Sequence, residues 1–279
     1  MPQLTTRCGT RLAYRVEGSG PPLVCLPGGP MMDAAYLGDL GGLDADRQLV
    51  LLDPRGTGDS EAPSDPRDYR VNKQVPDVEA LREHLGLEQL DLLGHSAGAN
   101  LVYRYVQAHP DRVSSLVLVT PSPYGLGLDV PDAMRATLAA SRAHEPWYPA
   151  AAAAFARVQD GAAEEADWVA MSPFSYARWD DRTREYDAWM DTRLNALGAE
   201  MFSVEDAFDP PGSRAALAAL DVPVVVLAGG LDLGNPPGAM AEVAALCPRG
   251  ELVVQPGAGH CPWFDDPAAF RALLLPYLT

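Results

Sequence analysis

The sequence predicts an α/β protein with a doubly wound, mostly parallel sheet and an inserted helical cap. Short, largely apolar runs recur at residues 23–26, 48–52, 90–93, 116–119 and 222–227, as is typical of strands that are covered on both faces. Segments with helical spacing alternate with these runs. Residues 122–211 contain no convincing buried strand and many helix formers. We therefore expect a core whose sequence is interrupted by a cap.

The first strands lead to a glycine-rich loop. Residues 11–16 alternate enough to predict a strand, and residues 17–20 predict a turn. The next strand, at 23–26, ends in Pro-Gly-Gly-Pro at residues 27–30. Glycine at the carboxyl end of a central strand lets a backbone N–H approach a ligand, so Gly29 is a candidate oxyanion donor. An ordinary Pro-Gly turn would explain the same residues.

A polar turn and an amphipathic helix come next. Residues 53–60 follow a strand and read Asp-Pro-Arg-Gly-Thr-Gly-Asp-Ser. We expect Asp53 and Arg55 to hold this turn together through backbone and ion-pair contacts, without a chemical role. Apolar residues spaced three and four apart predict a helix near 75–85 that ends at Gly86.

The sequence Gly-His-Ser-Ala-Gly at residues 94–98 lies between an apolar strand and a helix-compatible segment. A sharp strand-to-helix turn strains the serine backbone and projects its hydroxyl, while the glycines leave no Cβ to clash. Ser96 is therefore a candidate nucleophile. The helix that follows directs its free N–H groups at the same point, so the N–H of Ala97 is a second candidate oxyanion donor.

The cap and the return of the sheet determine the predicted domain organisation. Residues 122–211 hold 12 of the 21 aromatic residues. Packing of cap helices accounts for most of them, but some, with Trp179 as a candidate, are expected to line a substrate pocket beneath the cap. We predict a core at 1–121, a cap at 122–211 and the second part of the core at 212–279.

Two further polar residues follow apolar strands. Asp232 comes after the strand at 222–227, and His260 comes after a strand at 251–255. In a doubly wound sheet, reacting groups gather outside the carboxyl ends of the strands. Ser96, Asp232 and His260 are therefore predicted to form a catalytic triad, in which His260 acts as general base and Asp232 fixes its tautomer.

The composition excludes several classes of partner. The chain has 279 residues, a formal net charge of −17 and a pI near 4.5, which argues against nucleic acid and anionic membranes, since both require clustered Lys and Arg. No leader-like or membrane-spanning apolar stretch is present, so we expect a cytoplasmic protein. The four cysteines have neither paired nor metal-ligand spacing, and we expect reduced thiols, no metal and no cofactor.

These motifs together resemble the α/β-hydrolase fold family over almost the whole chain. The resemblance rests on the loop at 27–30, the turn at 53–58, the Ser96 motif, Asp232 and Gly259-His260. The loop and the turn are similar to those of the proline iminopeptidase-like branch. That branch usually has histidine at the position of Pro27 and commonly Gly-Gly-Ser-Trp-Gly around the serine. The form at 94–98 is widespread among esterases, lactonases and carbon–carbon bond hydrolases.

The favoured hypothesis is a serine hydrolase, proline iminopeptidase-like, that cleaves a small-molecule amide or ester through an acyl-enzyme. An esterase, a lactonase or a carbon–carbon bond hydrolase is the alternative. A hydrolase-like binding protein without turnover is a third hypothesis, from a different class. Dehalogenases and epoxide hydrolases resemble this fold but have aspartate where Ser96 stands.

The cap is acidic, with 16 Asp and Glu against 7 Arg and no Lys between residues 122 and 211. The resemblance implies that cap carboxylates recognise a substrate amino terminus, and Glu185, Glu200 and Glu205 are the candidates. A solvated acidic face explains the same charges. The sequence leaves the oligomeric state open.

Overall fold

The computed structural model describes residues 1–204 and 206–278. Its sheet has eight strands in the order β1-β2-β4-β3-β5-β6-β7-β8. The pairs from β4 to β8 are parallel, and β1 and β2 pair antiparallel at one edge. The strands are β1 (Gln3–Thr5), β2 (Arg11–Glu17), β3 (Pro22–Leu26), β4 (Gln48–Leu52), β5 (Leu90–His95), β6 (Val113–Val119), β7 (Val224–Gly229) and β8 (Gly250–Gln255). The prediction of a mostly parallel, doubly wound sheet is confirmed.

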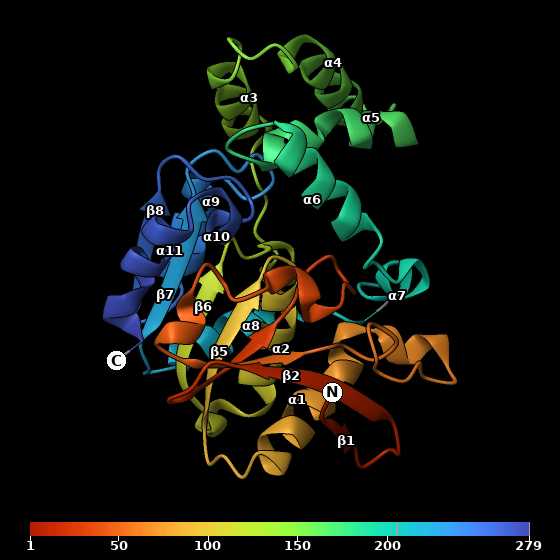
Figure 1. The fold of residues 1–279 in the computed structure, drawn as a ribbon, viewed down its shortest axis with the longest axis vertical. Helices are drawn as coiled ribbons and strands as arrows, with labels where there is room; N and C mark the ends of the chain where they lie inside the picture. The colour runs from red at the N-terminus through yellow and green to blue at the C-terminus, as the bar shows by residue number, and fades with distance from the viewer. Residues whose placement is uncertain (205, 279) are drawn as a thin grey trace.

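Helices lie on both faces of the sheet and continue beyond it (Figure 1). They are α1 (Val71–His84), α2 (Gly98–Ala108), α3 (Asp132–Ser141), α4 (Tyr148–Gln159), α5 (Glu165–Met171), α6 (Asp181–Asp191), α7 (Ala196–Met201), α8 (Pro210–Ala219), α9 (Pro237–Ala245), α10 (Pro262–Asp265) and α11 (Pro267–Leu274). Among the short 3₁₀ turns are η1 (Ala34–Leu37), η5 (Tyr124–Leu126) and η6 (Ser172–Ser175). Within the described residues, none of the helices is long and apolar enough to cross a bilayer.

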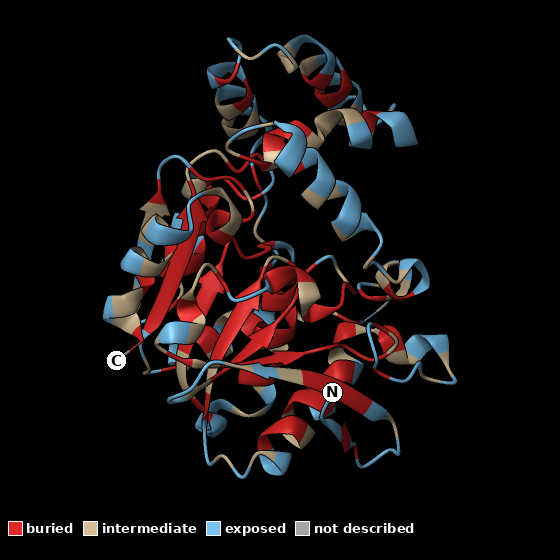
Figure 2. Cartoon of the chain, in the orientation of Figure 1, coloured by how far each residue is buried: buried red, intermediate tan, exposed pale blue. Residues whose placement is uncertain are grey.

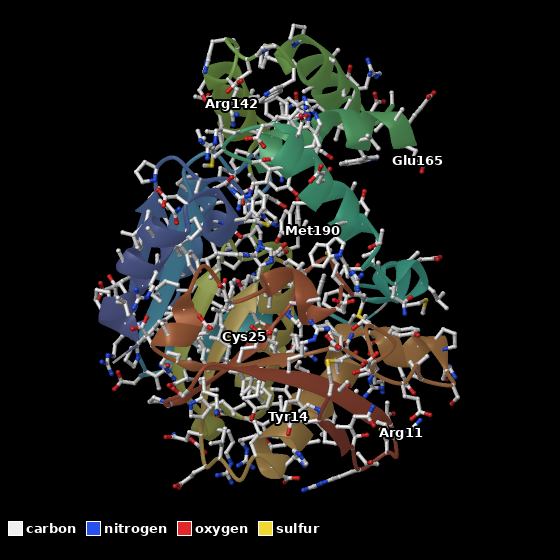
Figure 3. The ribbon with its side chains drawn as sticks, viewed as in Figure 1. Arg11, Tyr14, Cys25, Arg142, Glu165 and Met190 are labelled. Atoms are coloured by element: carbon white, nitrogen blue, oxygen red, sulfur yellow. The ribbon has the colours of Figure 1, made fainter. Side chains whose placement is uncertain are left out.

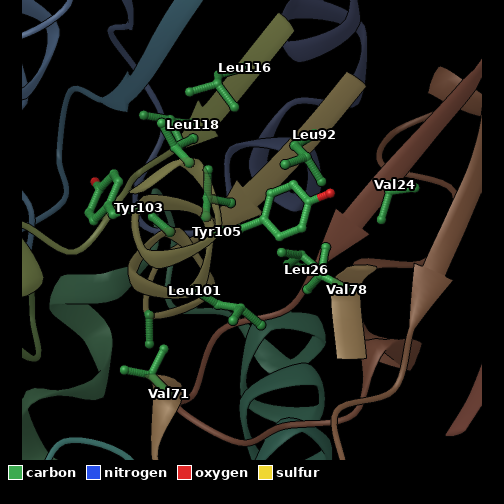
Figure 4. Packing of buried hydrophobic residues seen from close by; sticks show 14 of the residues in the cluster. Val24, Leu26, Val71, Val78, Leu92, Leu101, Tyr103, Tyr105, Leu116 and Leu118 are labelled. Atoms are coloured by element: carbon green, nitrogen blue, oxygen red, sulfur yellow. The ribbon is translucent and has the colours of Figure 1, made fainter. Parts of the chain in front are cut away.

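The alternation of side chains along the strands divides the core into two layers. Val24 and Leu26 of β3 belong to the layer that α1, α2, α8 and α9 cover, and Figure 4 shows them with Leu92 and Tyr105. Leu23 lies in the other layer, with α11. Because strand side chains point to opposite faces in turn, apolar runs without interruption fill both layers. Figure 2 shows the central strands buried along most of their length.

The turn after β4 is held by its charged residues. Asp53 Oδ1 accepts a hydrogen bond of 2.9 Å from the backbone N–H of Ala34. The guanidinium of Arg55 donates two hydrogen bonds, of 2.7 and 2.6 Å, to the carboxylate of Asp77 in α1. Both side chains of this ion pair are 4% exposed. The predicted structural role of Asp53 and Arg55 is confirmed.

Helices α3 to α6 lie beyond the carboxyl ends of β6 and β7, and α7 packs beside the 3₁₀ turn at Pro66–Tyr69 (Figure 1). Figure 3 shows Arg142 and Glu165 in this helical region and Cys25 in the sheet. A small apolar cluster, which includes Phe155, Phe174 and Leu233, joins these helices to the loop after β7. The expected boundary at residue 211 falls inside α8, which packs against α2. The division into core and cap therefore stays a prediction.

Helix α1 and strand β1 differ from the sequence-based expectations, as do the bounds of β6 and β7. Helix α1 begins at Val71, four residues before the expected start, because Arg70 has an extended backbone and the helix continues past Pro76. Strand β1 was not expected, since it has only three residues, of which one is buried. Antiparallel pairing with β2 holds this short strand at the edge of the sheet.

The Arg55–Asp77 pair allows a stability test. Asp77→Asn leaves a buried guanidinium without its counter-charge, so we expect the free energy of unfolding in urea to fall by about 3 to 5 kcal/mol. Asp181→Asn is the matched control, because the Asp181 carboxylate in its pair with Arg184 is 96% exposed, and it should leave the unfolding midpoint almost unchanged. Equal, small effects of the two substitutions would contradict a structural role of the buried pair.

Candidate active site

Ser96 occupies a strained turn between β5 and α2. Its φ is +51°, a left-handed value that few residues other than glycine adopt. The turn is held on both sides, because Ser96 N–H donates to the carbonyl of Val119 at 3.1 Å and the Ser96 carbonyl accepts from Ser122 N–H at 2.9 Å. The surrounding hydrogen bonds thus keep the serine in a conformation that lifts its side chain out of the strand.

The glycines around Ser96 permit this close packing. A Cβ on Gly94 would lie 2.8 Å from Cγ2 of Val102, and a Cβ on Gly28 would lie 2.8 Å from Cβ of Ser96. A Cβ on Gly98 would collide with the carbonyl oxygens of Leu26 and Pro27. The turn therefore requires glycine at these positions, because any side chain there would collide with neighbouring atoms.

The structure brings Ser96, Asp232 and His260 together in one hydrogen-bonded line. Nε2 of His260 lies 2.9 Å from Oγ of Ser96, and Nδ1 lies 2.7 Å from Oδ2 of Asp232. A carboxylate only accepts, so Nδ1 has the proton and Nε2 is free to accept from the serine hydroxyl. This arrangement can remove the hydroxyl proton and stabilise the imidazolium that results.

Asp232 is fixed by its own loop. Its side chain is 2% exposed, and Oδ1 accepts from the N–H groups of Gly234 and Asn235 at 2.9 and 3.1 Å. Asn235 also donates from Nδ2 to the carbonyl of Thr120 at 2.8 Å. One carboxylate oxygen is thus used for orientation, and the other faces the imidazole.

The environment of His260 sets its proton affinity. Burial opposes the charged form of the ring, but the negative charge of Asp232 and the hydrogen bond to it outweigh burial and raise the pKa of His260. The ring is the neutral base only at pH values above this raised pKa.

Gly29 and Ala97, the two predicted oxyanion donors, lie in the loop after β3 and at the start of α2, and their role stays a prediction. Within residues 1–204 and 206–278, the backbone N–H groups of both residues lack a hydrogen-bond partner. The two strand ends lie in contact at this point, since a Cβ on Gly28 would lie 3.3 Å from the Ala97 nitrogen. Gly29 is exposed, whereas Gly28 N–H is already bonded to Tyr36.

A buried chain of hydrogen bonds, which the sequence did not reveal, links this loop to the triad. Gly28 N–H donates to Oη of Tyr36 at 2.6 Å, and Tyr36 Oη lies 2.6 Å from Nδ1 of His95. Nε2 of His95 lies 3.0 Å from the carbonyl of His260. Burial and the neighbouring His260 hold the pKa of His95 well below its usual range. The neutral ring donates from Nε2 and accepts the Tyr36 proton at Nδ1.

The backbone of His260 has two more contacts. Oγ1 of Thr120 donates to the His260 carbonyl at 2.9 Å, and His260 N–H donates to the carbonyl of Ser175 at 2.7 Å. The position of His95 inside the serine motif was the one available sequence indication of this network. Nothing in the sequence indicated Tyr36 or Thr120.

The cap residues that were singled out lie apart from the triad contacts. Glu185 and Glu200 are exposed, and Glu205 lies outside the described residues. Trp179 is half-buried, with Tyr176 5.8 Å away between ring centroids. It lines a hollow with Trp147 and Arg178. Substrate binding by these four residues stays a prediction.

A second hollow is lined by residues that neighbour the triad in sequence or through a hydrogen bond, and not by Ser96, Asp232 or His260 themselves. Its volume is about 520 Å³, and it lies between the cap helices and the loop after β7. Ser175, whose carbonyl binds His260, lines it together with Leu233 and Asn235. No group of three or more His, Cys, Asp and Glu side chains in the described part of the chain is arranged to hold a metal ion.

Known proteins are similar to this chain in sequence or in structure. The chain is 26% identical to a putative 2-succinyl-6-hydroxy-2,4-cyclohexadiene-1-carboxylate synthase of Bacillus subtilis, over 99% of this chain and 97% of that protein. It is 31% identical to a probable proline iminopeptidase of Streptomyces coelicolor, with 86% and 83% of the two chains covered. The crystal structure of an esterase from Rhodococcus sp. ECU1013 covers 99% of this chain and 98% of its own, with a TM-score of 0.72 and 25% identity.

The alpha/beta hydrolase fold family matches residues 21–267, which include β3 to β8 and all three residues of the hydrogen-bonded line. The chain therefore belongs to the alpha/beta hydrolase fold family and is a hydrolase of that fold.

Proposed function

We propose that the chain is a serine hydrolase that cleaves a small ester or amide through an acyl-enzyme on Ser96. The observation that supports this most directly is the unbroken line from Asp232 through His260 to the serine, with distances of 2.7 and 2.9 Å. A non-catalytic binding protein would have no need of a strained serine with a base at hydrogen-bond distance.

In the acylation step, Oγ of Ser96 attacks the substrate carbonyl and its proton passes to Nε2 of His260. The oxyanion that forms accepts hydrogen bonds from the N–H groups of Gly29 and Ala97. Collapse of this intermediate breaks the bond to the leaving group, which takes the proton from His260. Water then gives a proton to His260 and attacks the acyl carbon. The bond between this carbon and Oγ of Ser96 breaks, Oγ takes the proton back from His260, and the carboxylic acid leaves.

Two substrate classes agree with the chemistry. The Streptomyces relative supports the proline iminopeptidase-like version, in which the substrate has a free amine. The Rhodococcus structure supports an esterase, and lactones and carbon–carbon bonds beside a carbonyl are open to the same nucleophile. Exposure of Glu185 and Glu200 favours the esterase version, because a solvated carboxylate gains little from an ammonium group.

Removal of the nucleophile or the base tests the mechanism. Ser96→Ala and His260→Ala should each lower kcat for a chromogenic ester by roughly 10⁴-fold, and the double variant should be little worse, because the two groups act as one unit. Ser64→Ala, at an exposed serine, is the control and should keep full activity. Losses that multiply in the double variant would count against the assignment.

The pH dependence of kcat/KM tests the role of Asp232. The raised pKa of His260 means that the base is protonated at low pH, so activity should rise with pH through an apparent pKa above about 6.5, the ordinary histidine value. Asp232→Asn removes the charge that raises this pKa. The acidic limb should therefore move to lower pH while the plateau falls, and an unmoved limb would show that another acid serves His260.

A pair of esters tests the substrate class. We expect an α-amino ester and the same ester without its amine to have kcat/KM values within about threefold, because screened charges on exposed carboxylates contribute little. A preference for the amine of roughly 10-fold to 100-fold, which fades as pH rises past the substrate amine's pKa, would instead establish the iminopeptidase version.

A further inference from the structure

The hollow beside the triad has an apolar wall and an open mouth. Phe155, Phe174 and Leu233 are buried in its wall, and Trp168 is 59% exposed at the same hollow. Its volume of about 520 Å³ suits a small organic ligand. An exposed indole beside buried rings provides a surface on which the apolar part of a ligand can pack.

The segment at residues 122–125, whose Tyr124 lines the hollow, is hydrogen-bonded to the nucleophile turn and to α2. Ser122 N–H donates to the Ser96 carbonyl, and Gly125 N–H donates to Oδ1 of Asn100 in α2 at 3.1 Å. Tyr124, which is 54% exposed, lies between these two anchored residues. The hollow is thus connected to the nucleophile turn through residues 122–125 and to His260 through Ser175.

Arg135 of α3 lines this hollow and is the one cation in its lining. Its Nη2 donates to Oη of Tyr124 at 2.9 Å. Across residues 1–204 and 206–278, no carboxylate lies within 4.0 Å of its guanidinium. Asp132, one turn earlier in the same helix, also lines the hollow without reaching ion-pair distance. The guanidinium therefore retains donors that the protein does not use.

Four of the other six cap arginines have a carboxylate partner, whereas Arg178 and Arg182, like Arg135, have none within 4.0 Å among the described residues. Arg157 is paired with Asp167, and Arg193 lies 3.4 Å from Asp33. What separates Arg135 from Arg178 and Arg182 is its place, because it alone of the three lines the hollow of about 520 Å³.

We propose that the hollow binds a substrate with an apolar body and an anionic group, and that Arg135 holds the anion with Tyr124 beside it. This inference rests on the proposed function, since it assigns the part of the substrate remote from the bond that Ser96 attacks. A planar guanidinium is suited to a carboxylate, which it can bind through two parallel hydrogen bonds. Because the described lining of the hollow contains no other cation, the anionic group depends on this side chain.

Binding of a matched pair of probes tests the site without turnover. The protein is the full-length Ser96→Ala variant, and the probes are 4-phenylbutyrate and the isosteric 4-phenylbutanamide, titrated by calorimetry. We expect the carboxylate to bind roughly 10-fold to 100-fold more tightly than the amide, as is typical of a charge-assisted contact. Adding Arg135→Gln should reduce this ratio to about threefold or less and leave the amide affinity almost unchanged.

Arg178→Gln is the matched control, because it removes the same charge from an exposed cap arginine at the hollow of Trp179. It should preserve the preference for the carboxylate. Equal affinities for the two probes, no binding of either, or a preference that survives Arg135→Gln would overturn the proposal. Since the probes are not turned over, a failure here is separable from a failure of the acyl-enzyme, which the neutral chromogenic ester reports.

Discussion

The crowding around Ser96 is the constraint on which the arrangement of the site depends. Its φ of +51° is held by hydrogen bonds to Val119 and Ser122, and this conformation is feasible because Gly28 and Gly94 have no Cβ. Parallel strands end side by side at this point, so the loop at Gly28 and the first turn of α2 are brought into contact. The strain is balanced by packing that the whole sheet provides.

The backbone of His260 is hydrogen-bonded both to the core and to the cap segment. Its carbonyl accepts hydrogen bonds from His95 and Thr120, and its N–H donates to Ser175 of the cap segment. Through His95 and Tyr36, the histidine is also linked to the loop of Gly28. A shift of the cap segment at Ser175 can therefore move His260 without moving Ser96. The neutral, buried His95 fixes the position of the Gly28 loop relative to His260.

The sequence predicts most of the core, because a covered parallel sheet requires uninterrupted apolar runs and a strained serine requires glycine neighbours. The sequence also identified Ser96, Asp232 and His260 as candidates, because each of them follows a strand and these strands end at the same edge of the sheet. Tyr36 could not, because an ordinary tyrosine in a short 3₁₀ turn has no pattern that indicates a contact 59 residues away. The cap was the least predictable part, since helix formers and acidic residues do not specify which side chains face the hollow. Arg135 became a candidate only when the structure placed it in the lining of the hollow.

The central claim is that Ser96 is activated by His260, and stoichiometric labelling tests it most directly. The wild-type protein is treated with a small fluorophosphonate, and intact mass and peptide mapping report the number and place of the adducts. We expect one adduct per chain, on Ser96, and slow or absent labelling when His260 is replaced by alanine, because the hydroxyl then lacks its base. An adduct on another residue, or unchanged labelling without His260, would contradict it.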